Sequence, residues 1–275
     1  MNRWQKVVKT IAIVLAVFLA VSILSGLLNL ASLAMYVISP DDYKNTEKNE
    51  DGYFELDAEE STNMEIELSS VSLSVKNGDS FRIYTNSDNI KFVQKTNGKI
   101  KITEKRPFTL FRVHSTDEHL IIELPEEFIF DTFCLQSGAG IIGIHTLAAK
   151  KLDLELGAGA LSADKLFATE EADIDGGTGN ITIKDGRLNK LDMDLGVGEV
   201  NLRAKLDNKC DIDFGVGNAK LLLLGEPEDY FIKTNKGVGS VTINDLPASK
   251  YSNPSKNGAP VYLDGGVGNI TVDFE

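Results

Sequence analysis

The sequence predicts an all-β protein: a single-stranded β-helix, or β-solenoid, with about 19–20 residues per turn, preceded by one N-terminal transmembrane helix. Three observations support this fold class. A Gly-x-Gly tripeptide recurs at near-constant spacing, the residues around each copy alternate between apolar and polar, and one long uncharged apolar run lies near the N-terminus. The length of 275 residues, 42% of them hydrophobic, suits a globular protein of one or two domains.

The apolar run, residues 11–38, predicts a transmembrane anchor. No charged residue lies between Thr10 and Pro40. Roughly 20 apolar residues span a bilayer, whereas the apolar core of a cleaved signal peptide has about 7–15. The run is long enough to stay in the membrane, although the small-x-small triplet Ser32-Leu33-Ala34 keeps cleavage open as an alternative.

The flanking charges predict the orientation of this anchor. Residues 1–10 carry Arg3, Lys6 and Lys9 and no acid, and the chain after the anchor continues with Asp41 and Asp42. Cytoplasmic flanks are enriched in Lys and Arg. The sequence therefore predicts a single-pass cell-membrane protein with a cytoplasmic N-terminus and an extracytoplasmic C-terminal domain.

Residues 39–51 are acidic and poor in apolar side chains, which predicts a hydrated stalk. Removing the three N-terminal cations from the net charge of −13 leaves −16 on residues 41–275. Nucleic-acid binders need a basic surface that displaces counterions from phosphates. The charge therefore excludes a nucleic-acid partner, and it leaves the lipid bilayer as a partner only through the N-terminal helix.

The repeat is defined by seven Gly-x-Gly tripeptides, separated by steps of 19, 20, 19, 19, 22 and 29 residues. Periods of this size indicate a repeat architecture. The predicted structural corners are Gly138 and Gly140, Gly157 and Gly159, Gly177 and Gly179, Gly196 and Gly198, Gly215 and Gly217, Gly237 and Gly239, and Gly266 and Gly268.

Alternation on both sides of each tripeptide predicts two short strands per turn. Leu191, Met193 and Leu195 precede one pair of glycines, and Val200 and Leu202 follow it. Each set has period 2, and the parity changes between them, so a bend is expected at the glycines. Such strands bury their apolar face only when the turns stack, at about 4.8 Å. A β-sandwich is the alternative, but it would not require glycines at a 19-residue register.

The repeat divides the domain in two. Residues 132–275 contain the regular Gly-x-Gly turns, whereas residues 52–131 alternate without the glycines, as in Met64–Leu68, and are predicted to form irregular early turns. Residues 106–115 break the alternation and predict a protruding loop.

The last repeat interval is unusually long because it contains residues 249–258. The C-terminal strand, Asn269 to Glu275, is expected to end the stack. Its Asp273 and Glu275 would then protect an open strand edge from pairing.

Acidic residues recur at outward positions before the glycines, and in a solenoid they stack into columns. They are candidates for an interaction face, either for weak divalent-cation binding or for a cationic partner, and the alternative is a solvated face without a ligand. The candidates are Asp173, Asp175, Asp192, Asp194, Asp211 and Asp213.

No pattern in the sequence indicates catalysis, a resident metal or a cofactor. The three histidines show no metal-ligand spacing, and no HExxH, GxSxG or P-loop motif occurs. Gly138-Ala-Gly-Ile-Ile-Gly143 matches a dinucleotide fingerprint, but a strand follows it where that site needs a helix. Paired aspartates could act as acid and base in a carbohydrate-active β-helix enzyme. An active site breaks a repeat, however, whereas these aspartates follow it.

The block from Leu120 to Ile144, in which Pro125 precedes a strand and the first Gly-x-Gly, resembles the bacterial β-strand-repeat proteins called putative adhesins. Membrane-anchored members include the LiaG-like envelope proteins. The resemblance covers about residues 52–275 and implies a surface β-helix linked with the cell envelope. The family has no settled biochemical activity, so it implies no functional residues.

These observations predict a non-enzymatic envelope protein that displays an acidic β-solenoid for interaction, adhesion-like or envelope-stress roles, with an envelope polymer or a protein as its unknown partner. A scaffold that polymerises through exposed end strands is a further alternative.

Overall fold

The computed structural model describes residues 52–105 and 118–275. The predicted N-terminal segment (1–10), anchor (11–38), stalk (39–51) and loop at 106–115 lie outside these residues. Within the described part, no helix has the length and apolar character needed to cross a bilayer.

The described chain is all-β, as predicted, with fourteen strands and a single 3-10 turn, η1, at Pro227–Asp229. The strands are β1 (Phe54–Leu56), β2 (Asn63–Leu68), β3 (Ser72–Asn77), β4 (Arg82–Thr85), β5 (Ile90–Gln94), β6 (Ile100–Glu104), β7 (His119–Leu124), β8 (Ile129–Ile183), β9 (Gly186–Asn189), β10 (Leu191–Asp207), β11 (Cys210–Leu223), β12 (Tyr230–Ile243), β13 (Leu246–Pro247) and β14 (Ala259–Phe274).

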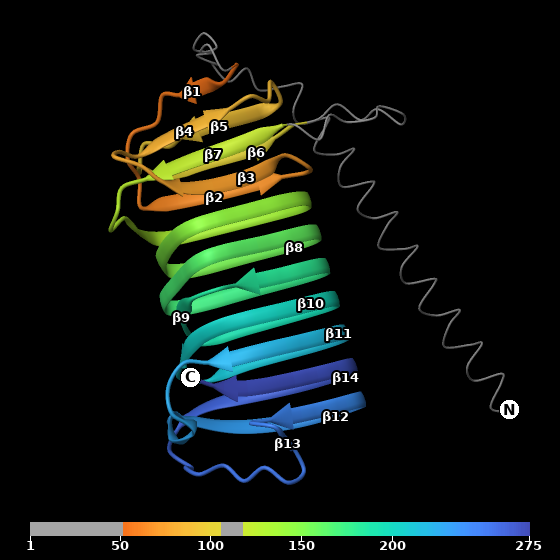
Figure 1. Cartoon of the computed structure of the whole chain (residues 1–275). Helices are drawn as coiled ribbons and strands as arrows, with labels where there is room; N and C mark the ends of the chain where they lie inside the picture. The colour runs from red at the N-terminus through yellow and green to blue at the C-terminus, as the bar shows by residue number, and fades with distance from the viewer. Residues whose placement is uncertain (1–51, 106–117) are drawn as a thin grey trace, which may run out of the picture. The chain divides into compact units, whose positions relative to one another are not determined.

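The chain winds into stacked coils whose strands pair in parallel (Figure 1). The 55 residues of β8 run through several coils without interruption, and β10 and β11 continue the stack. The repeats pair in register, so that Gly179, Gly198 and Gly217 lie on one line. This confirms the predicted solenoid-like stacking of the Gly-x-Gly turns.

The core lies inside the coils and is lined by the inward half of each alternating strand. Leu191, Met193 and Leu195 before the corner of β10 are buried, and so are Val200 and Leu202 after it. Burial of each such side chain contributes about 1.5–3 kcal/mol. Because one coil cannot enclose these groups alone, the apolar pattern drives the stacking.

The corners require glycine for two physical reasons. The second glycine of each pair has a positive φ, such as +152° at Gly198, which other L-residues rarely adopt. A Cβ on Gly198 would also lie only 1.6 Å from the carbonyl oxygen of Gly179 in the adjacent coil. At the first glycine, a Cβ on Gly196 would lie 2.5 Å from the carbonyl oxygen of Gly177. The seven-fold repeat of glycine therefore follows from the close stacking of the corners.

The first coil closes its corner without glycines. Ser69, Ser70 and Val71 stand at this corner, and the carbonyl oxygen of Ser69 accepts the backbone N–H of Ala139 from the next coil. On the far side of this coil, β6 and β7 pair in parallel with β2 and β3, and the Oε2 atom of buried Glu104, the last residue of β6, accepts the N–H groups of all three corner residues at 2.8–2.9 Å. One carboxylate thus satisfies three backbone donors of this corner.

Antiparallel strands cover this end of the solenoid. Strand β1 pairs with β4, β4 pairs with β7, and β5 pairs with β6, all antiparallel, whereas the coils themselves pair in parallel. These hairpin-like additions break the repeat geometry, so the end does not present another equivalent coil.

The other end of the solenoid differs from the prediction. The order of strands is β11-β14-β12-β13, so the C-terminal strand β14 lies between β11 and β12 (Figure 1). It pairs in parallel with both neighbours, as in Val216↔Val267 and Val238↔Val267. The expectation that the C-terminal strand forms the open end was therefore wrong. The terminal coil is β12, which comes earlier in the sequence.

Burial explains this order. Leu263 in β14 is fully buried between two coils, whereas Thr234, its partner in β12, is half-buried in the coil that has only one parallel neighbour. A hydroxyl group costs free energy when buried without a partner, so the strand that carries it is better placed at the end. The residues of the long interval, 244–258, lead the chain from β12 to its place inside the stack.

The chain end is held by side chains and backbone together. The guanidinium of Arg203 donates two hydrogen bonds to the carboxylate of Glu275, at 2.9 and 3.1 Å, and one to Asp185 at 3.0 Å. The backbone of Glu275 bonds to Leu223 and Gly225. At the terminal coil, the amide side chain of Asn253 bonds to both the N–H and the carbonyl oxygen of Ile232, which satisfies part of the edge.

Candidate functional site

The predicted acidic residues stack into two columns on the outer face of the strands that precede the glycine corners. In the first column, Asp192 pairs in register with Asp173 on one side and with Asp211 on the other. In the second, Asp194 lies between Asp175 and Asp213. The structure therefore brings all six predicted residues together on three adjacent coils.

The two columns end differently toward the terminal coil. The first continues from Asp211 to Tyr262, which Lys209 and Lys233 approach at 5.2 and 5.0 Å from the ring centroid. The second continues through Asp264 to Asn235. The acidic character thus extends one coil further in the second column than in the first.

The second column carries the less compensated charge. Among the described residues, Asp194, Asp213 and Asp264 make neither a hydrogen bond nor an ion pair through their side chains, whereas Asp211 accepts a hydrogen bond from Lys209 at 2.5 Å. Exposed carboxylates at rung spacing repel one another. The column therefore produces a line of negative potential along the stack.

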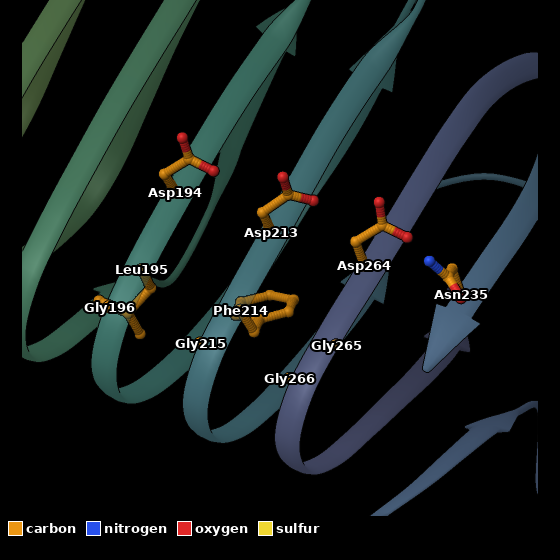
Figure 2. A pocket seen from close by; sticks show the side chains of 10 residues that line it. All are labelled: Asp194, Leu195, Gly196, Asp213, Phe214, Gly215, Asn235, Asp264, Gly265 and Gly266. Carbon is orange, nitrogen blue, oxygen red and sulfur yellow. The ribbon is translucent and has the colours of Figure 1, made fainter. Parts of the chain in front are cut away.

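A shallow groove of about 450 Å³ runs beside this second column. The carboxylates of Asp194, Asp213 and Asp264 project from parallel ribbons along one side, with Asn235 next in line (Figure 2). Leu195, Phe214 and the backbone of the glycine corners line the remainder; the corner residues are Gly196, Gly215, Gly265 and Gly266. Because these glycines lack side chains, their backbone is accessible beside the carboxylates.

A second groove, of about 680 Å³, continues along the same outward column toward the first coils. It is lined by Glu67, Gln136, Glu155, Asp175 and Asp194, and it also meets the buried Glu104. Asp194 lines both grooves, so the two adjoin at this residue. We call the two grooves together the acidic furrow.

The pKa values reflect the crowding of the columns. Partial desolvation by the neighbouring coils raises the pKa of Asp173 to about 6, and the charges of Asp175, Asp153 and Asp192 contribute to the same rise. The same causes, desolvation first, raise the pKa values of Asp192 and Asp213. Ionisation of these aspartates therefore lowers the stability of the folded state.

The arrangement suits a line of cations better than one chelated ion. Within residues 52–105 and 118–275, no group of three or more His, Cys, Asp or Glu side chains converges in a way that could hold a metal. Carboxylates at successive coils, about 4.8 Å apart, instead offer many equivalent weak contacts.

Of the other reactive groups, Cys134 lies beside the first acidic column, where its thiol contacts the carboxylate of Asp153, whereas Cys210 lies in the core. Burial raises the pKa of the Cys210 thiol to about 11, and both Cys210 and Cys134 are free. His145 and Lys184 both contact the carboxylate of Asp164, at 2.9 and 2.8 Å, on an exposed surface. These groups are explained by local packing and ion pairing.

Two features of the site were not predicted from the sequence. Asn235 continues the acidic column only because β12 stacks beyond β14, and the sequence order does not show this. Glu104 reaches the corner of the first coil from more than 30 residues away. In the sequence, Glu104 is a glutamate at the end of a predicted strand and before an irregular segment. That position alone does not indicate a buried hydrogen-bond acceptor.

Three solved structures match most of the chain at low sequence identity. A putative adhesin from Bacteroides fragilis is 12% identical with a TM-score of 0.48, and the match covers 80% of this chain and 95% of that chain. A putative cell adhesion protein from Clostridium sporogenes is 19% identical with a TM-score of 0.31, covering 84% and 97%. A putative adhesin from Parabacteroides merdae is 12% identical with a TM-score of 0.42, covering 84% and 100%.

A search of the curated proteins finds no match. The family model described as Toastrack DUF4097 matches residues 61–252, which include the early strands and most of the repeat. The predicted resemblance to the putative-adhesin proteins is thereby confirmed at the level of the family. The chain belongs to the Toastrack DUF4097 family.

Proposed function

We propose that the protein is a non-enzymatic, membrane-anchored component of the cell envelope, and that it displays its acidic solenoid outside the cytoplasmic membrane to bind a cationic partner. The observation that carries the proposal is the part of the acidic furrow in which the unpaired carboxylates of Asp194, Asp213 and Asp264 repeat from coil to coil beside the glycine corners. The apolar run at 11–38 and its flanking charges support the anchor and its orientation.

The repetition of the carboxylates favours binding over catalysis. General acid–base catalysis needs two carboxyl groups placed differently around one reacting bond. In the furrow, Asp194, Asp213 and Asp264 occupy equivalent positions on successive coils. Such a column recognises a repeated or diffuse positive charge, as in divalent cations or a basic polymer of the envelope.

Two experiments test the proposal separately. The first is protease treatment of intact cells that carry the full chain with a C-terminal tag. An extracytoplasmic domain predicts loss of the tag while a cytoplasmic control protein survives. Digestion only after permeabilisation would contradict the topology.

The second experiment measures binding by calorimetry on the purified full-length chain, with calcium and polylysine as separate probes. We expect heat from at least one probe, and at least a fivefold weaker response from the variant Asp194→Asn/Asp213→Asn/Asp264→Asn. The matched control removes three exposed acids outside the furrow: Glu126→Gln/Glu170→Gln/Glu171→Gln. Equal weakening by both triple variants would show a general charge effect and contradict the furrow as the site.

A further inference from the structure

A row of exposed valines lies along the outer edge of the glycine corners. Val197, Val216, Val267 and Val238 are the central residues of four Gly-x-Gly tripeptides and pair in register on adjacent coils. Their exposed fractions are 47%, 47%, 49% and 70%. The row, which we call the valine ridge, is about 14 Å long at a coil spacing of about 4.8 Å.

The fold itself does not require valine at these positions. The corresponding residues of earlier coils are Ala139, Ala158 and Thr178. The central residue points away from the core, and Val197, Val216 and Val267 still expose about half of their surface although they stack in register, so valine adds exposed apolar surface at each corner. Contiguous exposed apolar surface marks an interaction site more often than isolated apolar residues do. The glycines on both sides leave bare backbone, which lets a partner surface approach the ridge closely.

The two flanks of the ridge carry different chemistry. On one side lies the acidic column, with Asp213 and Asp264 followed by Asn235. On the other side lies a ladder of amide and hydroxyl groups formed by Asn218, Asn269 and Ser240. Within this ladder, Asn218 Oδ1 accepts from the Asn269 side chain at 3.3 Å, and Asn269 Oδ1 accepts from the Ser240 hydroxyl at 2.7 Å.

Symmetry makes these flanks complementary between two copies in one orientation. If a two-fold axis runs parallel to the stack, the ridges meet and each acidic column faces the partner's amide ladder. Asp213 then lies opposite the partner's Asn218, and Asp264 opposite the partner's Asn269. If the axis runs across the stack, acidic column faces acidic column, and the like charges repel.

The coil of β10 limits the contact to the last three coils. There Glu199 takes the position that Asn218 has in the next coil, so a parallel pair would place it opposite an aspartate. The coils of β11, β14 and β12 carry no such glutamate. They also contain three of the four valines, including the most exposed, Val238.

We propose that the valine ridge is a docking surface for a second copy of the chain, in a parallel two-fold arrangement centred on β11, β14 and β12. The two-fold axis places equivalent valines opposite each other at the same height, so the ridges make apolar contact, and the amide groups donate to the facing carboxylates. The surface is smaller than that of stable dimers, and each domain is strongly acidic, so the association is weak and favoured by high local concentration.

The orientation is tested by cysteine cross-linking of the full-length chain, purified in detergent at high protein concentration. Cys134→Ser removes the more accessible native thiol, and Cys210 is buried. Differently tagged chains carry Asp213→Cys or Asn218→Cys and are mixed with a short bismaleimide. The parallel dimer predicts that the mixed pair cross-links at least tenfold more than either same-residue pair. Detergent makes the result independent of anchoring and topology.

Val267→Asp is the disrupting variant and should reduce the mixed cross-link at least tenfold. The matched control is Val93→Asp, because Val93 is also exposed, at 42%, but lies on β5 away from the ridge. This control should leave the cross-link unchanged. Three outcomes would each overturn the proposal. The first is predominant cross-linking between two Asp213→Cys chains, and the second is a mixed cross-link that Val267→Asp does not reduce. The third is a mixed cross-link no stronger than the one seen with Val267→Asp.

Discussion

At the scale of the residue, the glycine corners show how close stacking selects one amino acid. The second glycine of each pair has a positive φ, and a neighbouring carbonyl oxygen lies where a Cβ would stand. A substitution here therefore causes backbone strain and a clash with backbone, and a change of side-chain rotamer removes neither. The corner therefore tolerates less change than the apolar core, where side chains can repack.

Gly198→Ala should destabilise the fold by about 3 kcal/mol or more, because backbone strain and a clash with the Gly179 carbonyl add together. Gly143→Ala is the control, since Gly143 has no positive φ and the nearest atom to the position that its new methyl group would take is 4.0 Å away. Thermal unfolding followed by circular dichroism compares them. Equal melting temperatures for the two variants would contradict the steric explanation.

Glu104→Ala should cost about 3 kcal/mol, because it leaves three backbone N–H groups of the first corner without their acceptor. Glu104→Gln keeps one carbonyl oxygen at the same place and should cost clearly less. Urea denaturation gives both free energies. If the two variants lose the same stability, hydrogen bonding by this side chain does not explain its burial.

The stacked aspartates predict a dependence of stability on pH. The pKa of Asp173 is about 6 in the folded chain, against an ordinary value of 3.8, because of desolvation and then neighbouring charges. A raised pKa means that the folded state binds the proton more tightly. The stabilisation is complete below pH 3.8 and is lost as the pH rises through 6.

Asp173→Asn should therefore raise the melting temperature at pH 7, where the native carboxylate is charged, and the advantage should shrink as the pH falls from 7 to 4. Glu171→Gln, an exposed change near it in sequence but outside the columns, serves as the control. A melting-temperature difference for Asp173→Asn that stays constant across this range would show that the carboxylate is not destabilised by its neighbours.

At the scale of the element, the inserted strand β14 is the main departure from a regular solenoid. It has thirteen paired positions with β12 and a parallel ladder of similar length with β11, so it holds the last coils together. A chain end in this position is protected from fraying, and the Arg203–Glu275 contacts add to this.

The order of the last coils predicts opposite tolerance at two paired positions. Leu263→Thr should lower stability by about 2 kcal/mol or more, because Leu263 is fully buried between coils. Thr234→Leu, at the register partner in the terminal coil, should change stability by less than half as much. Urea denaturation compares the two, and a larger loss at Thr234 would indicate that β12, not β14, occupies the interior.

At the scale of the whole molecule, repulsion between negative charges opposes the stabilisation that comes from the apolar interior. The net charge of −13 and the aligned columns disfavour the compact state, and the continuous apolar interior stabilises it. The same repulsion keeps copies apart except where an uncharged surface such as the valine ridge can meet another.

Added salt should therefore stabilise the protein. Screening shortens the reach of repulsion between exposed carboxylates, so the melting temperature of the full-length chain should rise with sodium chloride. The rise should be smaller in Asp173→Asn/Asp192→Asn/Asp194→Asn than in Glu126→Gln/Glu170→Gln/Glu171→Gln. Equal rises in both triple variants would show that the net charge matters and the columns do not.

By itself the sequence determined the repeat. Glycines every 19–20 residues, with strict alternation around them, predict coils that stack and aspartates that align. The prediction is possible because the steric need for glycine and the burial of apolar side chains recur in each repeat. Anchor, stalk and orientation remain predictions from the sequence, as they lie outside the described residues.

Only the tertiary structure decided the order of the last two coils and the closure of the first. The tripeptides that begin at Gly237 and Gly266 fit the same kind of corner equally well. The local sequence pattern therefore could not show which of the two coils lies at the end of the stack. Their order depends on which strand has a parallel neighbour on both sides, and the role of Glu104 depends on the stacking of β6 beside β2. Both depend on contacts between residues far apart in the sequence, which the period of the repeat does not fix.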